Sequence, residues 1–259
     1  MSMPVVILCG GQGTRFREQT ENRPKPMIDV VGRPILWHIM SFYAGHGFKD
    51  FVLCLGYKAE VIKRYFLDFA AMESDFTVDL SAPNKVQYHG ASMREWKVTC
   101  VDTGMNAMTG ARLKRVEHFL ESDHFLLTYG DGLSDVDVPA TVAFHKSHGK
   151  AATVTGVRPP SRFGELLLDG HKVEKFSEKP QVEGGYINGG FFVFSRDFLK
   201  YVKDDESQML EREPLERCAA DGQLMVYPHH GFWQCMDTFR DLTRLEEAWN
   251  DGKPPWRTW

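Results

Sequence analysis

The chain begins with an apolar run that leads into a glycine-rich loop, and this feature constrains the fold most. Residues 5–9 read Val-Val-Ile-Leu-Cys, and the loop that follows is Gly10-Gly11-Gln12-Gly13-Thr14-Arg15. Lys25 lies about ten residues further on, between two prolines. Glycines let a backbone approach a ligand closely, exposed N–H groups donate to phosphate oxygens, and Arg15 and Lys25 add positive charge. The segment therefore predicts a buried strand that leads into a phosphate-binding loop.

The sequence excludes two other kinds of phosphate loop. A Walker A loop requires G-x-x-x-x-G-K-[ST], and no such string occurs in the chain. A dinucleotide fingerprint requires a third glycine at position 16, where this chain has Phe16. The loop is therefore neither that of a P-loop NTPase nor that of a typical NAD site.

The bulk composition is that of a globular protein. The chain has 259 residues, of which 42% are hydrophobic and 25% charged, so we expect a single domain. A net charge of −4 argues against a nucleic-acid partner, and no basic run or apolar stretch of roughly 20 residues predicts a membrane partner. The cysteines are odd in number and none forms a C-x-x-C pair, which favours a reduced cytoplasmic protein without a zinc site.

The first 157 residues alternate between buried strands and helices. We expect strands at 5–9, 51–55, 98–101, 125–129 and 151–157, and helices at 34–46, 58–72, 109–121 and 139–147. This alternation predicts an α/β fold with a mixed, mostly parallel, doubly wound sheet of Rossmann-like type. Ligands of such sheets bind at the carboxyl ends of the strands, where both the glycine loop and Asp131 fall.

The second half of the chain, 158–259, has shorter elements within the same predicted domain. We expect small antiparallel strands at 164–168, 172–177 and 186–194, strand pieces at 226–227 and 232–234, helices at 196–202, 213–220 and 240–250, and an extended tail. Residues 76–101 lack helical periodicity and are interpreted as an insertion or hairpin in the first half, 1–157.

Two aspartates are candidate metal ligands. Asp131 lies between glycines at a strand end, where a hard carboxylate suits Mg²⁺ bound to phosphates, although an Asp-Gly turn explains it equally well. Asp237 precedes the last helix and is either a metal ligand or an N-cap. Because one carboxylate cannot fully serve both roles, a metal-binding Asp237 would leave Thr238 as the cap.

The glycine loop followed by Pro-Lys-Pro-Met resembles the signature of the sugar-nucleotidyltransferases. The resemblance implies that Asp131 and Asp237, the latter in a W-x-x-x-D-T string, hold Mg²⁺, with catalytic roles for Arg15, Lys25, Asp131 and Lys179. Lys179, in an F-x-E-K-P string, would meet the sugar phosphate, whereas in isolation it is interpreted as a solvated turn lysine. Sugar contacts are implied for Asn188, Gly189 and Glu165. Nucleotide contacts are implied for Leu8, Gly10, Gly11, Gln12, Gly13, Thr14, Arg15, Lys25, Gly130 and Asp131.

One departure from the family pattern points to a particular branch. Where other branches carry Q-x-x-x-x-G-T-A-x-A, residues 108–113 read Met-Thr-Gly-Ala-Arg-Leu. With the 76–101 insertion, His38 and the Trp-Arg-Thr-Trp ending, the chain resembles the branch that makes CDP-glucose and pyrophosphate from CTP and glucose 1-phosphate. Thr109 and Arg112 would then lie by the nucleotide. Otherwise Arg112 is a helix surface residue beside Lys114 and Arg115. Relatives are commonly oligomers, so we expect a homo-oligomer.

Three alternatives remain at the sequence level. The same chemistry on another nucleotide would make the protein a thymidylyl-, uridylyl- or guanylyltransferase. A non-catalytic relative would serve as a regulatory nucleotide-sugar-binding protein, although such chains are expected to lose a metal aspartate or the loop lysine. A glycosyltransferase would need a D-x-D motif, and the string at 135–137 fits by letter but is expected to cap the next helix.

Overall fold

Seven strands form the main sheet in the described part of the computed structural model, which covers residues 3–16, 20–81, 85–90, 94–158, 165–169, 172–177 and 185–259. The strand order is β14-β10-β13-β8-β1-β4-β7. Strand β13 runs antiparallel to both β8 and β10, and the other neighbours are parallel. The predicted mixed, mostly parallel sheet is confirmed. The bounds are β1 Val5–Leu8, β4 Asp50–Leu55, β7 Lys97–Asp102, β8 His124–Tyr129, β10 Ala152–Val157, β13 Ile187–Ser195 and β14 Leu224–His229.

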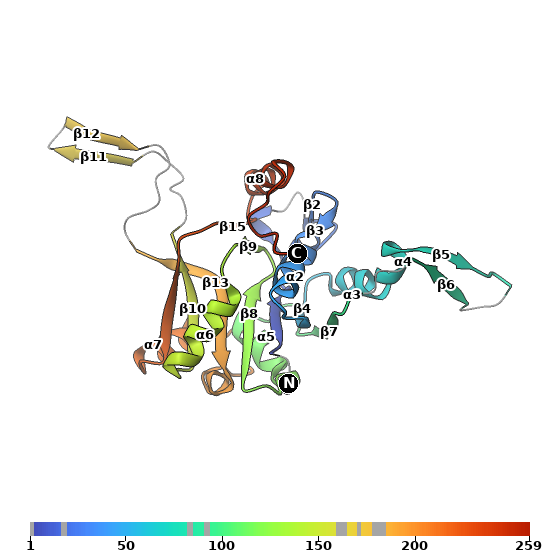
Figure 1. The fold of residues 1–259 in the computed structure, drawn as a ribbon. Coiled ribbons are helices and arrows are strands. Elements are labelled where there is room, and N and C mark those ends of the chain that lie inside the picture. Colours follow the sequence, from blue (N-terminus) through green and yellow to red (C-terminus); the bar gives the residue numbers. More distant parts are fainter. Residues whose placement is uncertain are drawn as a thin grey trace.

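Helices cover both faces of this sheet. Val5 and Ile7 of β1 pack in a core with α2, α3 and α6, whereas Val6 and Leu8 pack in a second core with α5, the 3₁₀ helix η4 and α7. Successive side chains of a strand point to opposite faces, so a strand buried on both sides reads as a continuous apolar run. The doubly wound arrangement is confirmed (Figure 1). The bounds are α2 Ile35–Gly45, α3 Ala59–Leu67, α5 Thr109–Arg115, α6 Val138–His148, η4 Arg196–Tyr201, α7 Glu213–Ala220 and α8 Phe239–Asn250.

Three predicted helices differ in detail from the observed ones. The helix expected at 58–72 breaks at Asp68, which ends α3 and precedes α4, Phe69–Glu73. The helix expected at 109–121 ends at Arg115 and continues as the 3₁₀ helix η3, Glu117–Phe119, and residues 196–201 are 3₁₀ helix. Among the helices of the described ranges, none has the length and apolar character needed to cross a bilayer.

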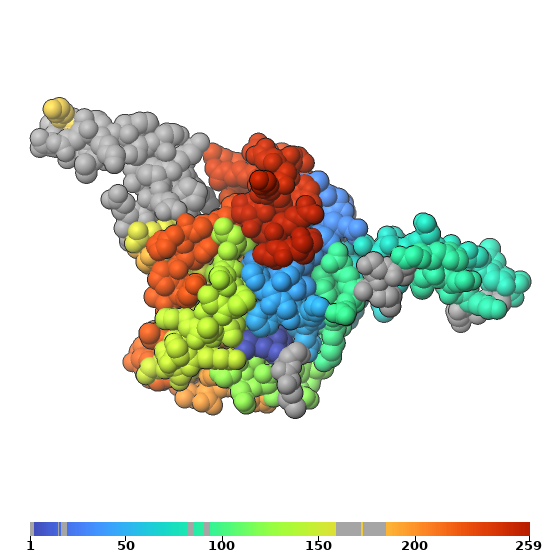
Figure 2. Space-filling model, in the orientation of Figure 1, coloured from blue at the N-terminus to red at the C-terminus, as the bar shows by residue number. Residues whose placement is uncertain are grey.

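The insertion forms an arm that projects from the body of the molecule (Figures 1 and 2). Strands β5, Asp75–Val78, and β6, Val86–His89, pair antiparallel, and the chain then returns to the sheet as edge strand β7. The expected hairpin is therefore confirmed. Further short strand pairs are β2 Asp29–Val30 with β3 Arg33–Pro34, β9 Gly132–Ser134 with β15 Trp233–Cys235, and β11 Glu165–Asp169 with β12 Lys172–Ser177. The segment between β1 and β2, which begins with the glycine loop, contains the 3₁₀ helices η1 Thr14–Phe16 and η2 Lys25–Met27.

The last residues of the chain form a turn, in which Arg257 N donates to the Pro254 carbonyl at 3.0 Å, and pack against α2, so the expectation of an extended tail is wrong. Trp256 is fully buried, and the Thr258 hydroxyl donates to the Phe42 carbonyl at 3.1 Å. Helix α2 is buried around its whole circumference from Ile35 to Tyr43 because the sheet covers one side and the C-terminal segment the other. Four tryptophan rings surround the buried His38 of this helix, at centroid distances of 5.0 to 6.4 Å: Trp37, Trp249, Trp256 and Trp259.

The buried His38 is neutral. Its Nε2–H donates to the Val30 carbonyl at 2.9 Å, and within the described residues its Nδ1 has no hydrogen-bond partner. Burial lowers the pKa of His38 from 6.5 to about 4, although the Val30 hydrogen bond raises it, and Arg33 lowers it further. In the unfolded chain the imidazole regains its ordinary pKa, so acid protonates the unfolded state first.

We expect acid to remove stability through His38. Its contribution is complete above pH 6.5 and is lost as the pH falls to 4, at a cost of about 3 kcal/mol. His38→Phe removes the titration, so the difference in free energy of unfolding between wild type and variant should shrink by about that amount from pH 7 to pH 4. Urea unfolding across this range measures it. His118→Phe, at an exposed histidine, is the control. A constant difference for His38→Phe would contradict the assignment.

Candidate active site

The glycine loop and Asp131 meet at the carboxyl edge of the sheet, as predicted. Strands β1 and β8 are parallel neighbours with Leu8 opposite Tyr129, so the loops that follow them begin side by side. A cavity of about 330 Å³ lies there. Its lining comprises Leu8, Cys9, Gly10, Gly11, Gly13, Thr14, Lys25, Pro26, Ala107, Met108, Thr109, Arg112, Tyr129, Gly130 and Asp131. Most of the residues predicted for the nucleotide therefore share one cavity, while Gln12 is exposed beside it.

Glycines in this loop make room for protein groups as well as for a ligand. A Cβ on Gly10 would lie 2.0 Å from Nη1 of Arg112, and one on Gly130 would lie 3.0 Å from the Leu8 carbonyl oxygen. Gly13 has φ +61°, in the left-handed region that favours glycine. Side chains at these positions would force apart the segments that form the floor of the cavity.

Arg112 is buried, so the interpretation as a helix surface residue is wrong. It is 4% exposed, and its guanidinium donates to the carbonyl oxygens of Leu55 and Gly10 at 2.8 and 3.0 Å. It also donates to Thr103 Oγ1 at 2.8 Å and to the Gly104 carbonyl at 2.9 Å. Burial lowers the pKa of Arg112. A single side chain thus ties together the loops that follow β1, β4 and β7 beneath the cavity.

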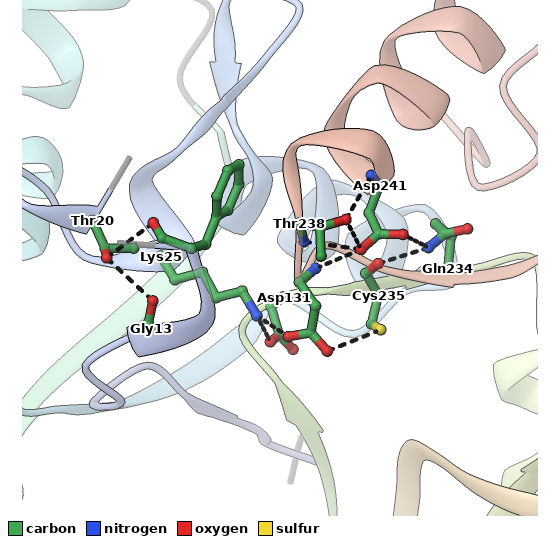
Figure 3. A network of polar contacts seen from close by, with 10 residues as sticks. Gly13, Thr20, Lys25, Asp131, Gln234, Cys235, Thr238 and Asp241 are labelled. Atoms are coloured by element: carbon green, nitrogen blue, oxygen red, sulfur yellow. Dashed lines mark hydrogen bonds and ion pairs between the residues drawn. The ribbon is translucent and has the colours of Figure 1, made fainter. Parts of the chain in front are cut away.

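Lys25 contacts both predicted metal ligands, and Figure 3 shows its side chain pointing toward Asp131. Its Nζ donates to Asp131 Oδ2 at 2.6 Å and to Asp237 Oδ1 at 2.5 Å. The lysine is 8% exposed at the start of η2, where Pro24 and Pro26 hold the backbone on either side. Burial lowers its pKa, but Asp131 and Asp237 outweigh that effect and raise it, so the ammonium stays charged.

The two carboxylates fit a divalent cation. Their oxygens converge on the Lys25 ammonium although one aspartate lies in the middle of the chain and the other near its end, and the three groups carry a net charge of −1. Hard carboxylate oxygens suit Mg²⁺, which usually keeps several waters and binds through one or two carboxylates plus substrate phosphates. In the part of the chain that the structure describes, no group of three or more His, Cys, Asp or Glu side chains forms a complete metal cage.

Helix caps are supplied by residues other than the metal candidates. Thr238 caps α8 because its hydroxyl accepts from Asp241 N, while Asp241 accepts from Thr238 N at 2.9 Å in a capping box (Figure 3). The prediction that Thr238, and not Asp237, is the cap is confirmed. Asp137 caps α6 by accepting from Ala140 N at 2.8 Å, so the D-x-D string contributes a cap as expected.

Thr109 and Asn188 lie on opposite sides of a hydrogen-bonded chain that the sequence did not predict. The Thr109 hydroxyl donates to Glu211 at 2.6 Å, and the Tyr129 hydroxyl donates to the same carboxylate at 2.5 Å. The Asn188 amide donates to Tyr129 Oη at 3.3 Å, while the Gly189 carbonyl accepts from Trp233 at 2.7 Å. Glu211 lies in a turn without any periodic pattern, which is why sequence reasoning missed it.

Three predicted residues cannot be placed fully. Lys179 lies outside the described residues, and the side chains of Arg15 and Glu165 do so as well, although their backbones belong to η1 and β11. The roles predicted for these side chains remain predictions.

Comparison with known proteins identifies the family. The family model described as nucleotidyl transferase matches residues 4–252. The glucose-1-phosphate cytidylyltransferase of Salmonella typhi is 49% identical over 258 residues, covering 99% of this chain and 100% of that protein. A Bacillus subtilis protein named "Probable glucose-1-phosphate cytidylyltransferase" is 43% identical over 257 residues with the same coverage. The crystal structure of HddC from Yersinia pseudotuberculosis matches with a TM-score of 0.69, over 95% of this chain and 99% of that one, and at 23% identity it shows the fold alone. The chain belongs to the nucleotidyl transferase family, and its sequence groups it with the glucose-1-phosphate cytidylyltransferases.

Proposed function

We propose that the protein makes CDP-glucose and pyrophosphate from CTP and α-D-glucose 1-phosphate. The observation that carries the proposal is the convergence of Lys25, Asp131 and Asp237 at the end of the glycine loop, in a chain 49% identical to a cytidylyltransferase. Transfer of a nucleotidyl group from one phosphate to another requires groups that position and stabilise the phosphates. Here these groups are the glycine loop, the buried ammonium of Lys25 and two carboxylates.

The reaction joins two anions, so its main obstacle is charge. A phosphate oxygen of glucose 1-phosphate attacks the α-phosphorus of CTP, and pyrophosphate leaves in line. The attacking oxygen is already ionised at neutral pH, so no general base is required. Mg²⁺ held by Asp131 and Asp237 would neutralise phosphate charge and align the α-phosphate.

The chain's own residues position and stabilise the reacting groups. The backbone from Gly10 to Thr14 cradles the nucleotide phosphates, and Arg112 holds that loop from below through the Gly10 carbonyl. Lys25, whose pKa is raised by its two carboxylates, brings a permanent positive charge to the leaving pyrophosphate. Arg15 would assist it, and Lys179 would hold the attacking phosphate, with Asn188, Gly189 and Glu165 at the sugar.

The nucleotide preference is the first test of this function. Pyrophosphate release is measured with glucose 1-phosphate and Mg²⁺ in parallel reactions with CTP, dTTP, UTP, GTP and ATP. We expect CTP to be preferred by about tenfold or more in kcat/KM, since a site that hydrogen-bonds a base leaves buried polar groups unpaired with the wrong one. Preference for dTTP or UTP would make the protein a different nucleotidyltransferase. Folded protein with no turnover would support the non-catalytic alternative.

Loss of the charge of Lys25 or of Asp131 should abolish most of the turnover. We expect Lys25→Ala and Asp131→Ala each to lower kcat by about a hundredfold or more, because Lys25 supplies positive charge to the reacting phosphates and Asp131 would hold the Mg²⁺ that neutralises them. Steady-state pyrophosphate release at saturating substrates measures the effect. Lys49→Ala, which removes an exposed lysine paired with Glu95, is the matched control and should keep wild-type kcat. A near-normal kcat in either site variant would contradict the assignment.

The arm is the natural interface for a homo-oligomer. Its described strands are exposed, and apolar side chains of 42 to 48% exposure face water on it: Phe76, Val78, Val86 and Tyr88. A two-stranded hairpin is marginally stable alone in water, and clustered exposed apolar groups mark interaction sites. A groove of about 580 Å³, lined in part by Phe66, Phe69 and Trp96, lies at the base of the arm. We infer that a second copy of this chain covers these surfaces.

Charge on the arm should therefore disrupt the assembly. We expect wild-type protein to be oligomeric in light scattering coupled to size exclusion, and Phe76→Asp with Tyr88→Asp to shift it to a smaller species, because buried carboxylates without partners are costly. Phe119→Asp, at a 39% exposed phenylalanine of η3 outside the arm, is the matched control and should leave the mass unchanged. A monomeric wild type, or an oligomer insensitive to both arm changes, would refute this interface.

The cellular compartment follows from the cysteines. All five lie within the described residues and are unpaired: Cys9, Cys54, Cys100, Cys218 and Cys235. Burial raises the pKa of Cys54 to about 12, so its thiol is inert at neutral pH. Unpaired buried thiols are typical of a reducing compartment, and we infer that the protein works in the cytoplasm.

A further inference from the structure

The loop between η4 and α7 is fastened to the start of α5. The N–H groups of Met108 and Gly110 donate to the carbonyls of Glu206 and Gln208 at 2.8 and 2.9 Å, and Leu210 N donates to Thr109 Oγ1 at 2.8 Å. Because Met108 and Thr109 line the cavity, these bonds fasten the loop that carries Glu211 to the cavity wall.

The Glu211 carboxylate bridges the wall formed by α5 and the end of strand β8. Oε2 accepts from the Thr109 hydroxyl at 2.6 Å, and Oε1 accepts from the Tyr129 hydroxyl at 2.5 Å. The two hydroxyls belong to different elements, and both of their residues line the cavity. Hydrogen bonds to a charged acceptor are about twice as strong as those between neutral groups.

The chain continues from Tyr129 to the sugar side. Asn188 Oδ1 accepts from Gly190 N at 2.8 Å, which fixes the orientation of the amide, and Nδ2 donates to Tyr129 Oη at 3.3 Å. Burial and the Glu211 carboxylate raise the pKa of Tyr129, so its phenol stays protonated and donates to Glu211. The ring lies over Gly190, where an added Cβ would be 2.4 Å from Tyr129 Cδ2.

We propose that Glu211 is a positioning residue that couples the nucleotide side of the cavity to the sugar side, through Thr109 in one direction and through Tyr129 and Asn188 in the other. This inference rests on the proposed function, which assigns Thr109 to the nucleotide and Asn188 to the sugar. Glu211 acts through these side chains and not on the reacting phosphates. The loss of Glu211 should therefore weaken the binding of a ligand that spans both sides more than the binding of a ligand that occupies the nucleotide side alone.

Binding of CDP-glucose and of CDP, measured by calorimetry with Mg²⁺, distinguishes the two sides. Glu211→Gln keeps the side-chain length but leaves one acceptor for two hydroxyls. We expect this substitution to raise the Kd of CDP-glucose by about tenfold and the Kd of CDP by about threefold or less, in line with the loss of one hydrogen bond to a charged group. Tyr129→Phe keeps the ring over Gly190 and removes only the hydroxyl. Tyr129→Phe should raise the Kd of CDP-glucose by about fivefold to tenfold and leave the Kd of CDP unchanged.

The double variant tests whether the two residues act as one unit. If Glu211 affects sugar binding through Tyr129, the double variant Glu211→Gln with Tyr129→Phe should raise the Kd of CDP-glucose no more than about twofold above that of Glu211→Gln alone. Effects that multiply would overturn the coupling. Glu216→Ala, an exposed carboxylate on α7, is the matched control and should match wild type.

The remaining outcomes separate this inference from the function beneath it. A wild type that binds CDP but not CDP-glucose would overturn the proposed function, and this inference with it. A wild type that binds both ligands, with Glu211→Gln and Tyr129→Phe indistinguishable from Glu216→Ala, would overturn the role of Glu211 alone. If Glu211→Gln folds poorly, Tyr129→Phe still decides, because equal losses for CDP and CDP-glucose would contradict a sugar-side role.

Discussion

The shared ion pair of Lys25 with Asp131 and Asp237 is the interaction on which the site depends. It joins residues separated by 106 and 212 positions and thereby fixes the loop after β8 and the start of α8 against η2. The side chains of Lys25 and Asp237 are 10% and 13% exposed, so desolvation offsets much of their attraction and the ion pair alone does not account for their burial. Removing one partner of a buried pair costs about 3–5 kcal/mol, since the remaining charge is left uncompensated. Here the loss of Lys25 would leave two carboxylates facing each other.

Arg112 plays the complementary structural part. Its guanidinium satisfies carbonyl oxygens of loops that follow three strands, and Gly10 and Gly56 are small because that guanidinium fills the space a Cβ would take. The glycines that open the phosphate loop to a ligand therefore also admit the arginine that holds the loop in place. This geometry is consistent with an indirect role of Arg112 in nucleotide binding, because the arginine fixes the shape of the glycine loop.

Local signals in the sequence predicted those parts of the site that local chemistry determines. The apolar run before Gly10 and the position of Asp131 at a strand end follow from patterns spanning a few residues. Thr238 as the cap of α8 follows only if Asp237 is assigned to the metal, as the family resemblance implies. The burial of Arg112 could not be read in the same way. It follows Thr109 and precedes Lys114 and Arg115, a pattern typical of a solvated helix face. Two of its acceptors, the carbonyls of Leu55 and Gly10, lie 57 and 102 positions away in the sequence.

The position of the C-terminal segment could not be predicted from local sequence patterns either. Two prolines before Trp256 favour an extended backbone locally, yet the indole is buried because α2 presents an apolar surface with His38 at its centre. Glu211 is a third case, since a glutamate in a turn carries no periodic signal and its two hydroxyl partners come from elements about 80 and 100 residues away. In each case a tertiary partner, and not local propensity, determines the position.

The N–H groups of Met108, Gly110 and Ala111, at the start of α5, are engaged by the loop before α7. The start of a helix usually offers free N–H groups to an anion. In this chain the N–H groups of Met108, Gly110 and Ala111 already donate to carbonyls of the loop before α7, and the Thr109 hydroxyl is engaged by Glu211. Under the proposed function, positive charge for the phosphates is therefore expected from the glycine loop, Lys25 and Arg15. Under the same proposal, we expect the wall formed by α5, which carries Thr109, to face the base and ribose instead of the phosphates.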